Sequence, residues 1–260
     1  MNADRIKTID DVISALKTIV DETEKSNNPL GYFAVLYLTV TVKVKDGIET
    51  HYFDDGKRME QLDIIFAKRY IDAYIAWNRA ETVSKSWEKA FKLATNSKML
   101  VIQHLLMGMN AHINLDLGIA AAEISGTGQI SHLKNDFFKI NKILSSLVED
   151  IQSGLSSIWR PLKKVLAKTG KADNFLVDFS MELARDGAWK FANEVVLLKG
   201  SDKQTAILER DVTVARKAKI VTQPTKWIQF LLWIVRLGEK GSVSEKMRKL
   251  NSGSTNNGSR

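Results

Sequence analysis

The chain has 260 residues, of which 44% are hydrophobic, and this apolar content is enough to bury a substantial core. It contains no cysteine, which excludes disulfide bonds, thiolate nucleophiles and zinc sites with sulfur ligands. The net charge of +8 comes from 38 lysine and arginine residues against 30 acidic residues. Because no nucleic-acid-binding motif accompanies this charge, we expect no nucleic acid partner.

The first predicted element is an amphipathic helix over residues 9–24, which ends before Pro29. The next segment, residues 32–53, fits two templates. Its alternating β-branched residues between Thr39 and Val44, followed by Asp46 and Gly47, are compatible with a β-hairpin. Its apolar residues also recur at spacings of three and four, which is typical of a helix, and we favour the helix.

A strong helix is predicted over residues 57–79, after Asp54 and Asp55, which are well placed to cap its N-terminus. Asp63 lies in the middle of an aromatic and apolar stripe of this helix, where a solvated charge is hard to explain. One interpretation is a structural salt bridge to a buried arginine such as Arg185. The other is a carboxyl group with a raised pKa that acts as a general acid or base.

A short helix over residues 84–93 leads to the predicted central helix, residues 98–124, which is apolar on every side and therefore buried. Its polar side chains are His104, Asn110, His112, Asn114 and Asp116. His112 and Asp116 lie about 40° apart on one face of this helix, whereas the two asparagines point the opposite way. Each polar side chain buried here must find a partner or cost ~1–3 kcal/mol.

Further helices are predicted over residues 130–153, 158–168, 175–198, 205–220 and 227–237. The last is shorter than the roughly 20 residues of a membrane-spanning helix. We expect it to dock on the domain through Trp227, Phe230, Leu231 and Ile234, and a role at a membrane surface is the less favoured interpretation.

The predicted fold class is all-α, with a single helical domain over residues 1–238 in which antiparallel helices surround the central helix at residues 98–124. Residues 239–260 are rich in serine, glycine, asparagine and lysine and predict a flexible basic tail. The N-terminal residues contain no readable secretory signal, so we expect a cytoplasmic protein.

A set of sequence motifs runs through the chain between residues 31 and 220. The motifs are FDD at 53–55, MEQLD at 59–63, FAKRY at 66–70, LMGMNAHINLDL at 106–117, and DF at 136–137 followed by IN at 140–141. They resemble those of an uncharacterised bacterial family, domain of unknown function 5995. The resemblance implies a helical domain and supports the helix over the hairpin at residues 32–53, but it implies no reaction.

The candidate metal ligands are His104, His112, Asp116 and Asp136. Histidine and carboxylate side chains that converge from the helices of a bundle are a frequent route to a divalent metal site. His132 and Asp136 form a second histidine–aspartate pair four residues apart, like His112 and Asp116. The alternative for His112 and Asp116 is a structural hydrogen bond that holds two helices together.

We expect an enzyme that acts on a small molecule. In the favoured mechanism a divalent metal held by His104, His112 and Asp116 activates water to hydrolyse an ester or phosphoester. One alternative is metal-free acid/base catalysis of the cyclase or isomerase type on a small apolar substrate, with Asp63, His112 and Asp116 as catalytic residues. Another is a non-catalytic helical binding module with a structural polar core. No phosphate-binding glycine loop or dinucleotide fingerprint is present, so no nucleotide or flavin cofactor is expected.

Overall fold

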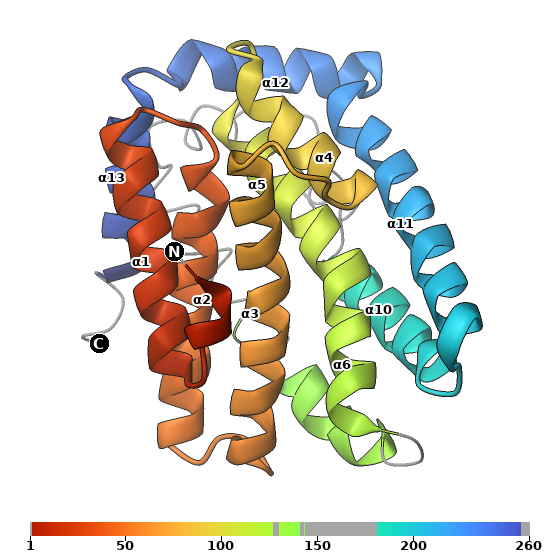
Figure 1. Ribbon diagram of the computed structural model, residues 1–260. Coiled ribbons are helices and arrows are strands. Elements are labelled where there is room, and N and C mark those ends of the chain that lie inside the picture. Colours follow the sequence, from red (N-terminus) through yellow and green to blue (C-terminus); the bar gives the residue numbers. More distant parts are fainter. Residues whose placement is uncertain (1, 127–129, 141–142, 144–180, 256–260) are drawn as a thin grey trace.

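The computed structural model describes residues 2–126, 130–140, 143 and 181–255 (Figure 1). Within these ranges the regular elements are helices, and no strand occurs among them. The fold class is therefore all-α, as the sequence predicts.

Three helices stand side by side at the N-terminal end of the chain, α1 (Ile9–Lys25), α2 (Gly31–Glu49) and α3 (Gly56–Asn78) (Figure 1). The first begins with a capping box, because the Thr8 hydroxyl accepts a hydrogen bond from the Asp11 amide while the Asp11 carboxylate accepts one from the Thr8 amide. The third is capped by Asp55, whose carboxylate accepts a hydrogen bond from the Arg58 amide at 2.9 Å.

Residues 32–53 lie in α2 and in the turn that follows it, so the helix was the correct choice over the hairpin. The β-branched residues are accommodated because Thr39 and Thr41 donate their hydroxyl hydrogens to the carbonyls of Val35 and Tyr37, one turn back. Gly47, where the alternative hairpin would have turned, is part of the same helix, and its missing side chain makes room for the ring of Phe53.

The central helix consists of three segments, α5 (Val101–Ala111), a π-helix (His112–Asp116) and α6 (Leu117–Ser125). Between residues 101 and 122 all residues but two are buried, as expected for a central helix. The helix begins at Val101 rather than residue 98 because Leu100 is extended. The Val101 amide donates to the carboxylate of Glu239, which lies far along the chain.

Neighbouring helices cover this central helix on several sides. α5 packs against α2, α4 (Lys85–Lys92) and α11 (Gly200–Thr222), and α6 packs against α3 and α10 (Met181–Val195). Gly118 permits the close approach of α10, since a Cβ atom there would lie 2.9 Å from the Ala188 carbonyl oxygen. The helix expected over residues 158–168 lies outside the described residues, as do parts of those expected over residues 130–153 and 175–198.

The C-terminal region contains α12 (Lys226–Gly238), which crosses one end of the molecule, and α13 (Val243–Thr255), which packs against α1 and α2 (Figure 1). The expectation of a flexible tail after residue 238 is wrong for α13, because Met247 and Leu250 give this helix an apolar side that is buried in the core. The expected docking of residues 227–237 is right for Leu231, which is buried, but Phe230 is 45% exposed. Among the described helices, none is long and apolar enough to cross a membrane.

Candidate functional site

Asp116 is the centre of a buried polar cluster at the π-helix. Its Oδ1 accepts a hydrogen bond from Arg69 Nε at 2.9 Å, and its Oδ2 accepts from Trp87 Nε1 at 2.8 Å and from His112 Nδ1 at 3.1 Å. Burial alone would raise the pKa of Asp116, but the hydrogen bond with His112 and the charge of Arg69 outweigh burial and hold this pKa below its ordinary value. Asp116 is therefore an ionised carboxylate in the interior of the protein.

His112 is held with one ring nitrogen toward Asp116 and the other unbonded. Because an ionised carboxylate only accepts hydrogen bonds, His112 Nδ1 carries the proton and Nε2 keeps a lone pair. Burial lowers the pKa of His112, and the hydrogen bond with Asp116 only partly opposes this shift. The imidazole is thus neutral at physiological pH, in a single tautomer. Its Nε2 atom is buried without a hydrogen-bond partner among the described residues.

The π-helix carries His112 and Asp116, and hydrogen bonds from neighbouring residues stabilise its geometry. A π-turn shifts the register of the helix and frees backbone groups from their usual partners. At this point Arg210 of α11 donates its Nε hydrogen to the Asn114 carbonyl at 2.8 Å. On the same side Asn110 donates to the Val214 carbonyl at 3.0 Å and accepts from Asn114 at 3.3 Å. The two asparagines therefore fasten the π-helix to α11 and leave the opposite face to His112 and Asp116.

Aromatic rings surround the His112 imidazole. Phe66 stacks on one face with ring centroids 3.6 Å apart, and Tyr37 meets the imidazole edge-on at 4.5 Å. Three further rings, those of Phe33, Trp87 and Tyr70, lie with their centroids between 5.7 and 6.1 Å away. These rings come from α2, α3 and α4, and together they exclude water from the imidazole.

Asp63 lies one turn before Phe66 in α3 and is also buried. Its Oδ2 atom has no hydrogen-bond partner among the described residues, and the ion pair with Arg185, one of the two interpretations of this residue, is not among its interactions. Burial, with a smaller contribution from the charge of Glu60, raises the pKa of Asp63 to about 7. Asp63 can therefore carry or release a proton near neutral pH.

Four buried polar atoms, on His112, on two of the tyrosines around it and on Asp63, lack hydrogen-bond partners within the described structure. They are Asp63 Oδ2, the hydroxyl oxygens of Tyr37 and Tyr70, and His112 Nε2. Burial raises the pKa of Tyr37 well above its ordinary value, and the carboxylates of Asp63 and Asp116 raise it further. Buried polar groups without partners are rare in proteins and cost free energy, so a cluster of them marks a place where a polar group of another molecule can bind.

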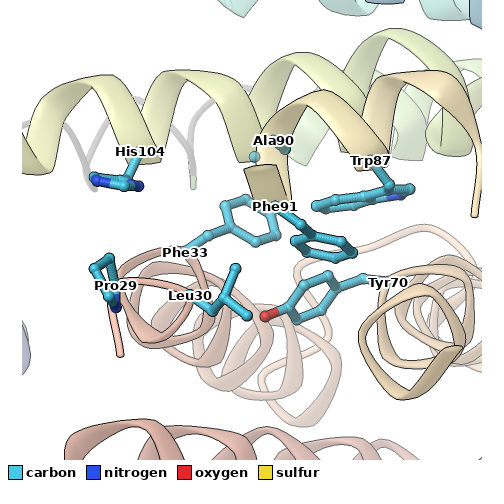
Figure 2. A pocket seen from close by; sticks show the side chains of 9 residues that line it. Pro29, Leu30, Phe33, Tyr70, Trp87, Ala90, Phe91 and His104 are labelled. Carbon is cyan, nitrogen blue, oxygen red and sulfur yellow. The ribbon is translucent and has the colours of Figure 1, made fainter. Parts of the chain in front are cut away.

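A small cavity lies beside this cluster, between α2, α3, α4 and α5 (Figure 2). Its volume of about 20 Å³ is enough for a water molecule. Figure 2 shows His104 at one end of the cavity next to Pro29, and Tyr70 and Trp87 at the other end. Because Phe33, Tyr70 and Trp87 contact both the cavity and the imidazole, a single layer of rings separates His112 from the cavity.

The structure does not bring the four predicted metal ligands together. Asp136 comes from another segment and lies beside the residues that precede α3, where it accepts hydrogen bonds from the amides of Asp54 and Asp55 at 2.7 and 2.9 Å. His104 packs against the ring of Tyr32, and burial lowers the pKa of His104 to about 4. No group of three histidine or acidic residues suited to a metal occurs in the described part of the chain. Both carboxylate oxygens of Asp116 accept hydrogen bonds, and His112 Nδ1 is bonded to Asp116, so Nε2 is the ring nitrogen of His112 that is left without a partner among the described residues.

Sequence reasoning identified Asp63, His112 and Asp116 but missed the partners that define their chemistry. Arg69 bonds to Asp116 on another helix, a contact that the spacing within its own helix does not predict. Trp87 and Tyr37 gave no signal beyond being apolar positions of their helices. A buried acid requires a donor or a cation, so Asp116 itself was the signal that a residue such as Arg69 had to lie nearby.

Comparison with known proteins agrees with the sequence resemblance. The sequence model of the Family of unknown function (DUF5995) matches residues 9–224, which is most of the chain. The chain therefore belongs to this family. No curated protein and no solved structure matches it. The match begins with α1 and ends between α11 and α12.

Proposed function

We propose that this member of the family is an enzyme that transfers protons within a small, mostly apolar molecule, in the manner of an isomerase or cyclase, without a metal. The observation that carries the proposal is the His112–Asp116 pair, in which the buried imidazole Nε2 keeps a lone pair and has no hydrogen-bond partner among the described residues. An imidazole oriented by an ionised carboxylate is the arrangement that lets histidine act as a general base.

The proton transfers use this chain's own side chains. His112 Nε2 accepts a proton from the substrate, and the imidazolium that forms is stabilised by the negative charge of Asp116 at 3.1 Å. Asp63, whose pKa is raised to about 7, is partly protonated at neutral pH and donates a proton to a second position of the substrate. Proton exchange with solvent afterwards restores both groups, so the net reaction moves a double bond or closes a ring.

The surroundings determine the class of substrate. In the described part of the chain, the rings of Phe33, Phe66 and Trp87 contact the imidazole, and the guanidinium of Arg69 is paired with Asp116. These surroundings favour an uncharged substrate over a phosphate or a carboxylate. The hydroxyls of Tyr37 and Tyr70 offer hydrogen-bond donors to a carbonyl or hydroxyl oxygen. A compact ketone or enone matches this chemistry, and because the cavity of about 20 Å³ holds only a water molecule, its binding requires the rings that line the cavity to move.

Deuterium exchange tests the proposal directly. The protein is incubated in D₂O with a panel of small apolar ketones and enones, and incorporation of deuterium next to the carbonyl is followed by NMR. We expect exchange above the buffer rate that falls at least about 100-fold in His112→Gln, since a general base contributes this much or more. His132→Gln is the matched control, because the side chain of His132 is exposed. Its exchange rate should equal that of the parent protein.

The same experiment separates the proposal from its alternatives. Exchange that requires added zinc or manganese and is stopped by chelator would favour the metal-dependent hydrolase. If no compound is exchanged and His112→Gln melts at a lower temperature than the parent protein, the polar cluster is a structural core of a binding module. Under our proposal exchange is insensitive to chelator and falls as the pH rises above 7, because Asp63 loses its proton.

A further inference from the structure

α12 is packed against the rest of the protein along only one stripe. Leu231 and Val235 are its buried residues, and they lie one turn apart. Arg236 and Glu239 hold its C-terminal end, since Arg236 donates to the Lys98 carbonyl and the Glu239 carboxylate accepts from the Val101 amide. The helix is thus fixed in place, with one face toward the core.

The opposite stripe of α12 is apolar and exposed. Phe230, Trp233 and Leu237 fall within about 60° of one another on the helix wheel and point away from the buried stripe. Their side chains are 45%, 55% and 59% exposed. Phe230 and Trp233 stack with ring centroids 6.1 Å apart, so they form a continuous aromatic surface. Large apolar side chains aligned on an outer face mark an interaction surface rather than scattered exposure.

The charge of this region is of one sign. From residue 212 to residue 238 the sequence contains no aspartate or glutamate, whereas Arg216, Lys217, Lys219, Lys226 and Arg236 are all basic. Lys226 begins α12 and is exposed, as is Lys219 at the end of α11. The aromatic stripe therefore lies in a positively charged part of the surface.

α12 also lies at the periphery of the molecule, where it crosses one end of the helical bundle (Figure 1). With 13 residues it is about 20 Å long, which is too short to span a bilayer. A fixed helix with an aromatic outer face and basic neighbours is suited to lie in the interface of a membrane, where its rings insert beneath the headgroups. The family match ends at residue 224, so this property belongs to a part of the chain outside that match.

We propose that α12 binds the surface of an anionic lipid membrane, with Phe230, Trp233 and Leu237 inserted and the lysines against the headgroups. The charge favours this occupant over a second copy of the chain, because two copies that meet at α12 would bring their basic residues together. It also favours anionic over neutral lipid, since each basic residue near an anionic surface increases binding by about fivefold.

Vesicle sedimentation tests this proposal with the full chain. Vesicles of phosphatidylcholine with 30% phosphatidylglycerol should bind the protein at least about tenfold more tightly than vesicles of phosphatidylcholine alone, and added salt should reduce the difference. Phe230→Ser, Trp233→Ser and Leu237→Ser combined should abolish binding at low salt. Because these side chains are exposed, circular dichroism and the melting temperature should stay unchanged.

Matched controls isolate the contribution of α12. The double variant Leu197→Ser, Leu208→Ser removes two exposed leucines outside α12, 73% and 65% exposed, and should bind vesicles like the parent. Lys226→Gln should weaken binding about fivefold.

The proposal is overturned if the triple variant binds as well as the parent, or if neutral and anionic vesicles bind equally. It is also overturned if sedimentation equilibrium shows that the parent protein is a dimer and the triple variant a monomer, while neither protein binds vesicles. The last outcome would assign the stripe to self-association.

Discussion

Four aspartates are buried in the described structure, Asp63, Asp116, Asp136 and Asp211. Asp116, Asp136 and Asp211 each accept hydrogen bonds from amide, indole or guanidinium donors. Asp63 Oδ2 accepts none from the described residues, although the cost of burying a carboxylate is highest where it is unpaired. The hydrogen bonds of the other three aspartates explain why they are buried. Stability does not explain the burial of Asp63, and this supports a catalytic role for it.

Asp63 should make the protein less stable as the pH rises. Its pKa is about 7 in the folded protein and near 3.8 in the unfolded chain, so the folded state binds more protons between these values. The contribution of Asp63 to the free energy of unfolding should therefore fall between pH 4 and pH 7, by at most about 4 kcal/mol, whereas His104, whose pKa is lowered to about 4, contributes with the opposite sign. Asp63→Asn should remove this fall and be more stable than the parent at pH 8. Urea unfolding at pH 5 and pH 8 measures the effect, with Asp186→Asn at an exposed position as control. Equal pH dependence in the parent and Asp63→Asn would contradict the assignment.

Trp87 should contribute to stability through its hydrogen bond as well as its packing. Trp87→Phe removes the indole donor that Asp116 Oδ2 accepts at 2.8 Å, which should cost about 2 kcal/mol because the acceptor is charged. It should also raise the pKa of Asp116, which carboxylate NMR can follow. Trp77→Phe is the control, since Trp77 packs on Phe91 in a similar aromatic environment. Equal losses of stability in the two variants would show that the hydrogen bond contributes nothing.

The candidate site could be predicted from the sequence only in part. His112 and Asp116 were recognisable because they share one face of an apolar helix, and Asp63 because it interrupts an aromatic stripe. Periodicity places side chains within one helix but carries no information on which helices face each other. The contacts of Arg69 and Trp87 with Asp116 depend on such packing, and so does the separation of His104 and Asp136 from the pair.

At the scale of helices, acidic side chains from distant elements cap several N-termini. Glu60 accepts from the Ile9 amide at 3.2 Å at the start of α1, and Asp211 accepts from the amides of Lys85 and Ser86 at the start of α4. Glu239 does the same for α5. The first amides of a helix have no partner within it, and an acid there also interacts favourably with the helix dipole. These contacts connect residues 51 to 138 positions apart and thereby help to specify the tertiary arrangement.

Gly108 should be required for the contact between α2 and α5. A Cβ atom at this position would lie 2.4 Å from the ring of Phe33, so Gly108→Ala should lower the free energy of unfolding by about 1–3 kcal/mol. At Gly187 in α10 the nearest atom to a Cβ would be the Arg210 guanidinium at 3.4 Å. Gly187→Ala should therefore raise stability by about 0.5–1 kcal/mol, because alanine favours the helix. Thermal unfolding should show a lower melting temperature for Gly108→Ala and a higher one for Gly187→Ala. Two shifts of the same sign would refute the packing argument.

Helix positions were more predictable than helix geometry. The helical spacing of residues 32–53 correctly outweighed their β-branched composition, because the threonine hydroxyls satisfy backbone carbonyls within the helix. The π-helix at residues 112–116 was not predicted, since a single extra residue in a turn leaves the apolar pattern nearly intact. Its cause lies in tertiary contacts, such as the hydrogen bond from Arg210 to the Asn114 carbonyl.

At the scale of the whole molecule, the C-terminal segment closes the fold against its first helices. In α13, Ser244 donates to the Glu24 carbonyl at the end of α1, and Arg248 pairs with the Glu24 carboxylate at 3.2 Å. Met247 fills the space beside Gly31 at the start of α2. Composition suggested a flexible tail because serine, asparagine and lysine dominate this segment. Two apolar residues one turn apart, Met247 and Leu250, are nevertheless enough to direct a short helix onto an existing core.

Removal of α13 should therefore destabilise the protein rather than leave it unchanged. A chain that ends after Lys240 keeps Glu239 at α5 but loses Met247 and Leu250, which are 1% and 5% exposed. Burial of two such side chains stabilises by about 3 kcal/mol, so the melting temperature should fall by several degrees in a single transition. Met247→Ala alone should lose about 2 kcal/mol, whereas Asn251→Ala, on the exposed side of α13, should lose nothing measurable. Differential scanning calorimetry of the four proteins gives the comparison. A truncated chain that melts with the parent would mean that α13 rests on the domain without stabilising it.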